Sequence, residues 1–146
     1  MKKKPDRLYV DKDDLKDFKL LQDEKDSPFY KRENKDVFIM ATIMGLKYGA
    51  RMALKSKEGF FREEYLNNDE RSIIKAIAIS EEKDVSVLND MDKVYQIAEE
   101  FAKAGIRYLR DSVFTKEHGS YLKRLESELL EDFEKYKIED SRELKK

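Results

Sequence analysis

The sequence predicts an all-α fold, a compact bundle of five or six helices that leaves room for a small hairpin between the first two core helices. Residues 91–111 carry the clearest signal, because apolar side chains recur on one face at helical spacing and charged side chains occupy the other. Residues 37–48 are apolar nearly all round, which is typical of a buried helix. A chain of 146 residues can bury such a core without disulfide bonds.

The segment from residue 91 to 111 is the longest regular helix that the pattern predicts. Asp90 precedes it and offers a side-chain oxygen for an N-cap. Tyr108 falls on the apolar face, which we expect to be core, and Glu100 and Lys103 fall on the charged face. This helix and the one at 37–48 are expected to form the central pair.

Charge and patterning divide the chain into three parts. Residues 1–33 are dense in charge and predict a partly ordered N-terminal arm. Within the arm, three apolar residues spaced three apart indicate one short docked helix: Leu15, Phe18 and Leu21. Residues 34–138 are expected to form the helical domain, and residues 139–146 a frayed tail.

Capping residues mark where further helices begin. Asn34 offers an N-cap oxygen, and Asp36 places a negative charge in the first turn. Residues 50–61 break the pattern and predict a loop or small hairpin. The Asn-Asn-Asp run at 67–69 then caps a segment whose length favours a helix, although the isoleucines at 73–79 would also suit a strand.

A last amphipathic helix is predicted at residues 120–137. Its apolar stripe is narrow enough to be a seam between two helices, and it consists of Leu125, Leu129, Phe133 and Tyr136. The stripe either closes the domain's own core or forms an interface with a partner protein or a second copy of the chain. A homodimer built on this helix is therefore one of the alternatives.

Composition excludes several classes of site. The 31 basic residues balance 32 acidic ones, so no overall field attracts nucleic acid and any charge argument must be local. The absence of cysteine excludes thiolate metal sites and thiol nucleophiles, and it fits a cytoplasmic protein. His118, the only histidine, lies in an expected loop, and the sequence has no glycine-flanked serine that could act with it in a Ser–His–Asp triad. We expect no catalytic residue, no metal, no cofactor and no membrane span.

A local excess of positive charge lies in residues 45–62, where five cations face one acid, Glu58. Three aromatic residues, Tyr48, Phe60 and Phe61, are interleaved with them. Cations neutralise phosphates and aromatic rings stack on unpaired bases, so this basic-aromatic segment is the predicted nucleic-acid interface. Its candidate contacts are Lys47, Arg51, Lys55, Lys57 and Arg62. The alternative is that the two phenylalanines are core and the cations decorate a loop.

A second candidate function rests on the run Glu81, Glu82 and Lys83, which follows apolar residues. It is similar to the acidic-x-Lys half of a metal-dependent nuclease site, which stands on a strand. No upstream aspartate completes such a site, and the charged end of a solvated helix is the alternative interpretation. A strand at residues 73–79 with an acid nearby would favour the nuclease.

Three segments between residues 35 and 110 resemble a small prokaryotic family, the proteins associated with dnd systems of DNA phosphorothioation and restriction. They read KDVFIMATIMGLKYGARMAL, NNDERSIIKAIAIS and YQIAEEFAKAGIRYL. The resemblance implies a cytoplasmic accessory protein of a DNA-modification or phage-defence system, whose partners are protein subunits of that system. It brings no catalytic residues. The positions that test it best are Lys35, Asp36, Gly45, Arg51 and Gly105.

Overall fold

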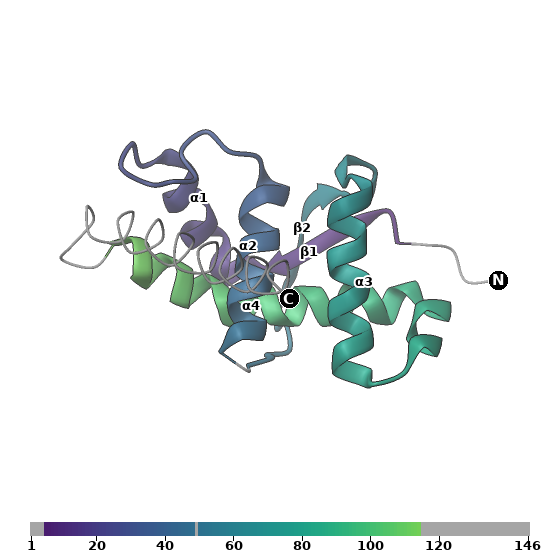
Figure 1. Cartoon of the computed structure of the whole chain (residues 1–146). Coiled ribbons are helices and arrows are strands. Elements are labelled where there is room, and N and C mark those ends of the chain that lie inside the picture. Colours follow the sequence, from purple (N-terminus) through teal and green to yellow (C-terminus); the bar gives the residue numbers. More distant parts are fainter. Residues whose placement is uncertain (1–4, 49, 115–146) are drawn as a thin grey trace, which may run out of the picture. The chain divides into compact units, whose positions relative to one another are not determined.

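The computed structural model describes residues 5–48 and 50–114. The chain divides into two units, residues 1–111 and 112–146, and the description concerns the first. In chain order the main elements are β1 (Arg7–Asp11), α1 (Leu15–Asp23), α2 (Asn34–Lys47), β2 (Lys57–Arg62), α3 (Asn68–Glu82) and α4 (Met91–Phe114) (Figure 1). Three short 3-10 helices lie between them: η1 (Lys12–Asp14), η2 (Glu63–Tyr65) and η3 (Val85–Asn89).

The fold is mainly helical, with four α-helices and a two-stranded antiparallel sheet among the residues described. The predicted mainly helical character is confirmed, whereas the all-α class and the number of five or six helices were wrong for these residues. A strand does lie between α2 and α3, but its partner is β1 at the start of the chain, with Arg7 opposite Arg62 and Asp11 opposite Lys57. Pairing between segments so distant in sequence leaves no local signal, whereas a hairpin would have a turn between its strands.

The N-terminal segment, predicted as a partly ordered arm, supplies a strand and a helix to the core of this unit. Leu8 and Val10 of β1 are buried, and so are Phe18 and Leu21 of α1. The short helix indicated by apolar residues three apart is therefore present. The strand before it was missed, because five residues with only two inward-facing apolar side chains do not make a periodic pattern.

Helices α2 and α4 cross in close contact (Figure 1). A Cβ atom added to Gly45 would overlap the backbone carbonyl of Phe101, and one added to Gly105 would overlap that of Ala41. The Thr42 hydroxyl, 3.3 Å from the Ala98 carbonyl oxygen, donates a hydrogen bond across the same crossing. The two glycines therefore let the helix backbones approach closely, which no side chain would permit.

The start of α2 differs from the prediction by one residue. Glu33 is the N-cap, and the Asp36 carboxylate accepts a hydrogen bond from its backbone N–H at 3.1 Å. Asn34 is the first helical residue, and its side-chain amide instead donates to the Phe60 carbonyl at 2.9 Å. The expected cap residue thus ties α2 to β2.

Helix α3 begins as predicted. The Asn67 side chain accepts from the Glu70 N–H, and the Glu70 carboxylate accepts from the Asn67 N–H, each at 2.8 Å. This reciprocal capping box defines the helix start. Ile74 and Ile77 are buried on one helix face. The strand considered for residues 73–79 is therefore wrong.

Helix α4 is buried on nearly all sides between residues 97 and 106. Asp90 caps it as predicted, accepting from the Lys93 N–H at 3.2 Å. Glu100 and Lys103 are buried, although the pattern placed them on a solvated face. Strand β1 and the chain after α2 cover that face, as the 3.2 Å hydrogen bond from the Met52 N–H to the Glu100 carbonyl shows. Among the described residues, no helix is both long and apolar enough to cross a membrane.

Candidate functional site

The two phenylalanines of the basic-aromatic segment belong to the core. Phe61 is 6% exposed and packs edge-on against Phe38, with ring centroids 5.2 Å apart. The Phe60 ring lies 4.6 Å from that of Phe18 on α1. These contacts hold β2 against α1 and α2; Phe61 is buried, and Phe60 is partly exposed.

Arg51 is held in an ion-pair network. Its Nη2 lies 2.6 Å from the Glu100 carboxylate and its Nη1 lies 3.0 Å from that of Glu81. The guanidinium also lies 5.9 Å from the centre of the Phe101 ring. Arg51 therefore fastens the chain after α2 to both α3 and α4, and a phosphate would have to compete with two carboxylates for it.

The other four cations of the segment are exposed. Lys47, Lys55 and Lys57 form no ion pair within residues 5–48 and 50–114. Arg62 makes a single exposed pair with Glu64 at 3.4 Å, which contributes little. Of the five predicted nucleic-acid contacts, the structure therefore leaves three lysines and Arg62 accessible and engages Arg51.

Tyr48 is the remaining aromatic residue of the segment, and it has a partner that the sequence did not indicate. Its ring stacks on that of Tyr108 from α4, with centroids 4.6 Å apart and planes inclined by 20°. The two side chains are 50% and 44% exposed. The Lys47 ammonium lies 5.9 Å from the Tyr48 ring, and Arg107 beside Tyr108 is also exposed. The prediction that Tyr108 is a core residue was wrong, because its position on α4 lies beyond the stretch that is buried all round.

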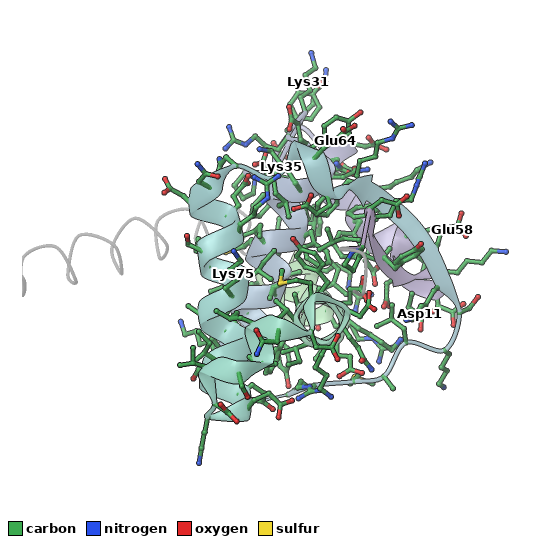
Figure 2. The ribbon with its side chains drawn as sticks, turned by 90° about the vertical axis from the view of Figure 1, so that its right-hand side faces the viewer. Asp11, Lys31, Lys35, Glu58, Glu64 and Lys75 are labelled. Carbon is green, nitrogen blue, oxygen red and sulfur yellow. The ribbon has the colours of Figure 1, made fainter. Side chains whose placement is uncertain are left out.

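A buried ionic cluster connects α4 to the N-terminal segment. The Lys103 ammonium lies 2.9 Å from the Asp11 carboxylate and 3.5 Å from that of Asp14, and all three side chains are almost inaccessible. Burial alone would raise the pKa of Asp11, but hydrogen bonds from Lys103 and from the backbone N–H groups of Lys55 and Asp13 lower it to about 2. Burial raises the pKa of Asp14. Figure 2 marks Asp11 at the end of the two strands that lies away from Lys35.

Glu99 is a second buried carboxylate on α4. The register of the sheet shifts between Leu8 and Tyr9, and the Tyr9 N–H donates to the Glu99 carboxylate at 2.9 Å. Burial is the main reason that the pKa of Glu99 rises to about 7, against the lowering effects of this hydrogen bond and of Lys57. The carboxylate thus satisfies a backbone donor at the irregular point of the sheet.

Replacing Glu99 with glutamine is expected to stabilise the protein at pH 8. The folded state holds the Glu99 proton up to about pH 7, whereas an unperturbed glutamate has a pKa of about 4.5. Wild-type stability therefore falls as pH rises through that window, since only the folded state retains the proton. The uncharged amide oxygen of the introduced glutamine would accept the hydrogen bond from the Tyr9 N–H at any pH. The stability of the variant should therefore not fall as pH rises through this window.

The measurement is the urea midpoint of wild type and Glu99→Gln at pH 5 and pH 8. Glu58→Gln, an exposed change on β2, is the matched control and should leave the pH dependence unaltered. Equal pH dependence in Glu99→Gln and wild type would contradict a raised pKa at this site.

The residues of the nuclease alternative do not form a metal site in the structure. Glu81 pairs with Arg51, and the Glu82 carboxylate lies 3.7 Å from the Lys93 ammonium. Lys83 ends α3 in the left-handed conformation, with φ of 56°. Within the part of the chain described, no group of three or more histidine, cysteine or acidic side chains is placed to hold a metal ion.

A pocket of about 530 Å³ opens at the start of α2. Its lining includes Lys35, Phe60 and Tyr65. The Lys35 ammonium lies 2.9 Å from the Glu70 carboxylate, so this cation links α2 to α3. Of the positions singled out for the family resemblance, Lys35, Gly45, Arg51 and Gly105 make contacts between elements, and Asp36 caps its own helix.

The predicted interface at Leu125, Leu129, Phe133 and Tyr136 lies outside the described residues, as do His118 and the expected tail. A search of curated proteins and a search of solved structures gave no significant match. A family model, that of DNA sulphur modification system-associated protein 4, matches residues 7–146. The match covers nearly the whole chain, including the segments before residue 35 and after residue 110 that the resemblance left out. The chain therefore belongs to the family of DNA sulphur modification system-associated protein 4.

Proposed function

We propose that this chain is a non-catalytic accessory protein of a DNA sulphur modification system, and that it binds the DNA backbone through the exposed cations between the end of α2 and the start of β2. Lys47, Lys55 and Lys57 carry the proposal, because they are exposed and form no ion pair within the described ranges. Exposed lysines neutralise phosphates and release counterions at little cost in folding energy. The family's association with a system that modifies DNA also supports DNA as the ligand.

Protein subunits of the same system are the proposed partners. The family description supports an association with that system, and the amphipathic sequence pattern at residues 120–137 is the predicted site of contact. Self-association through this segment is the alternative, and sedimentation at several protein concentrations separates the two.

An accessory role is favoured over the nuclease alternative by the contacts of the acidic run. The alternative required a strand under Glu81 and Glu82, and both side chains stand at the end of a helix, in ion pairs with Arg51 and Lys93. Lys83 serves the helix terminus. Each of the three residues therefore has a structural role that accounts for its position.

The test is fluorescence anisotropy of labelled duplex and single-stranded DNA, with and without backbone sulphur, titrated with the full chain at low and moderate salt. We expect a triple variant, Lys47→Gln, Lys55→Gln and Lys57→Gln, to bind at least about tenfold more weakly at low salt. We also expect the slope of log affinity against log salt to become shallower by up to about 3, since each phosphate contact contributes about 0.9 on duplex DNA.

The matched control removes three exposed lysines of the N-terminal segment, Lys16, Lys19 and Lys25, by the same substitution. Both variants lose the same net charge, so equal weakening would show a general charge effect and count against a site. Arg51 is left intact in both variants, because its removal would break the network with Glu81 and Glu100. Absence of wild-type binding at low salt would overturn the proposal.

A further inference from the structure

We infer that the stacked pair Tyr48–Tyr108, which we name the tyrosine platform, binds an unpaired base of single-stranded DNA. This inference rests on the proposed function and deepens it, because it specifies which form of nucleic acid the basic surface takes. The lysines alone would serve duplex and single strand alike. The platform adds a contact that only an unstacked base can make.

The geometry of the platform favours a ligand with a flat face. The two rings are nearly parallel, inclined by 20° with centroids 4.6 Å apart, so each tyrosine covers one face of the other. Their exposed fractions of 50% and 44% leave the rest of the ring surface open to solvent. Tyrosine is a preferred contact residue in binding sites, and this pair offers two half-exposed rings on one surface.

The charges around the platform match a phosphate backbone. Lys47 places its ammonium 5.9 Å from the Tyr48 ring. Arg107, which precedes Tyr108 on α4, is exposed, and its charge also acts on Asp14. The acid nearest along α4 is Asp111, whose carboxylate is paired with Arg110 at 2.9 Å. A base on the platform would therefore have cations within reach of its flanking phosphates, which is the arrangement of aromatic rings and positive charge that binds single strands.

In the sequence, the aromatic residues expected to stack on bases were Tyr48, Phe60 and Phe61. Phe60 and Phe61 are engaged in ring contacts with Phe18 and Phe38, which lie in the core. Tyr108, which is far from Tyr48 in the chain, supplies the second ring of the platform. Tyr48 and Tyr108 each follow the crossing glycine of their helix, Gly45 and Gly105, by three residues, so the close crossing brings the two rings together.

The experiment compares the affinity of the full-length wild-type protein for a short oligothymidine and for an abasic strand of the same length and charge, by anisotropy at low salt. We expect the oligothymidine to bind about tenfold or more tightly, since stacking one base on an aromatic side chain is worth a factor of this order. In the double variant Tyr48→Ala, Tyr108→Ala the two strands should bind equally. Tyr65→Ala, which removes another exposed tyrosine, should keep the preference.

The outcomes separate this inference from the proposed function. Equal binding of both strands by wild type would overturn the platform and leave backbone binding by the lysines standing. Binding of neither strand nor of duplex would overturn both. Because the abasic comparison uses the wild-type chain, it decides the matter even where the double variant fails to fold, which far-ultraviolet circular dichroism would reveal.

Discussion

Replacing Gly105 with alanine is expected to lower the free energy of unfolding by about 3 kcal/mol or more, the largest effect of any conservative change in this unit. The added methyl group would overlap both the Ala41 carbonyl and the Gly45 nitrogen of α2. Both are backbone atoms of a helix, so the clash is relieved only by moving α2 and α4 apart. Separation would also weaken the Thr42–Ala98 hydrogen bond at the crossing. Urea denaturation followed by circular dichroism measures the loss.

Gly59→Ala is the matched control for that experiment. A methyl group at Gly59 would lie 3.3 Å from the end of the Arg7 side chain, which is flexible and can move. We expect a change within about 1 kcal/mol, partly offset by the lower entropy of the unfolded alanine chain. A Gly105→Ala protein as stable as Gly59→Ala would show that the two helices are not in backbone contact.

Lys103→Met is expected to cost about 3–5 kcal/mol at pH 8, because it leaves Asp11 and Asp14 buried without a counter-charge. The loss should shrink as pH falls. In wild type the pKa of Asp11 is lowered to about 2, so its stabilising contribution is complete above the ordinary value of 3.8 and is lost below it. Without Lys103 the burial of both carboxylates raises their pKa, so the variant gains stability on protonation at mildly acidic pH.

Unfolding in urea at pH 8 and pH 5 tests this prediction. Lys19→Met, an exposed change on α1, should alter stability by no more than about 0.5 kcal/mol at either pH. Adding Asp11→Asn and Asp14→Asn to Lys103→Met should recover part of the loss, since no uncompensated charge then stays buried. An equal loss at both pH values, without recovery in the triple variant, would indicate that Lys103 acts through packing of its stem alone.

Arg51 was predicted to bind phosphate, but in the structure it forms ion pairs that hold segments of the chain together. Sequence reasoning grouped Arg51 with four other cations as a phosphate contact because they are close in the chain. In the structure it is the only one of the five that reaches two carboxylates, those of Glu81 and Glu100 from distant segments. The proposed binding surface therefore loses its central arginine and keeps the exposed lysines on either side of it.

The helical elements with strong local signals followed from the sequence. Asn67 and Glu70 cap α3 through side chains three residues apart, and Asp90 caps α4 in the same way, so short-range chemistry defines where these helices begin. The apolar composition of residues 37–48 likewise indicated a helix that packs in the core, and five residues of α2 are buried: Val37, Phe38, Ala41, Thr42 and Gly45. Membership of the family was also visible in patterns of small and apolar residues, and the family match confirmed it.

The pairing of distant segments depended on tertiary structure. No local pattern links β1 to β2, buries Lys103 between two aspartates, or stacks Tyr48 on Tyr108. The physical reason is that a periodic pattern shows only which side chains of one helix or strand are polar and which are apolar. A charged face becomes buried only when another segment of the chain covers it. For Lys103 the covering segment is the N-terminal one, which supplies Asp11 and Asp14. In the sequence, these aspartates have the pattern of solvent-exposed residues.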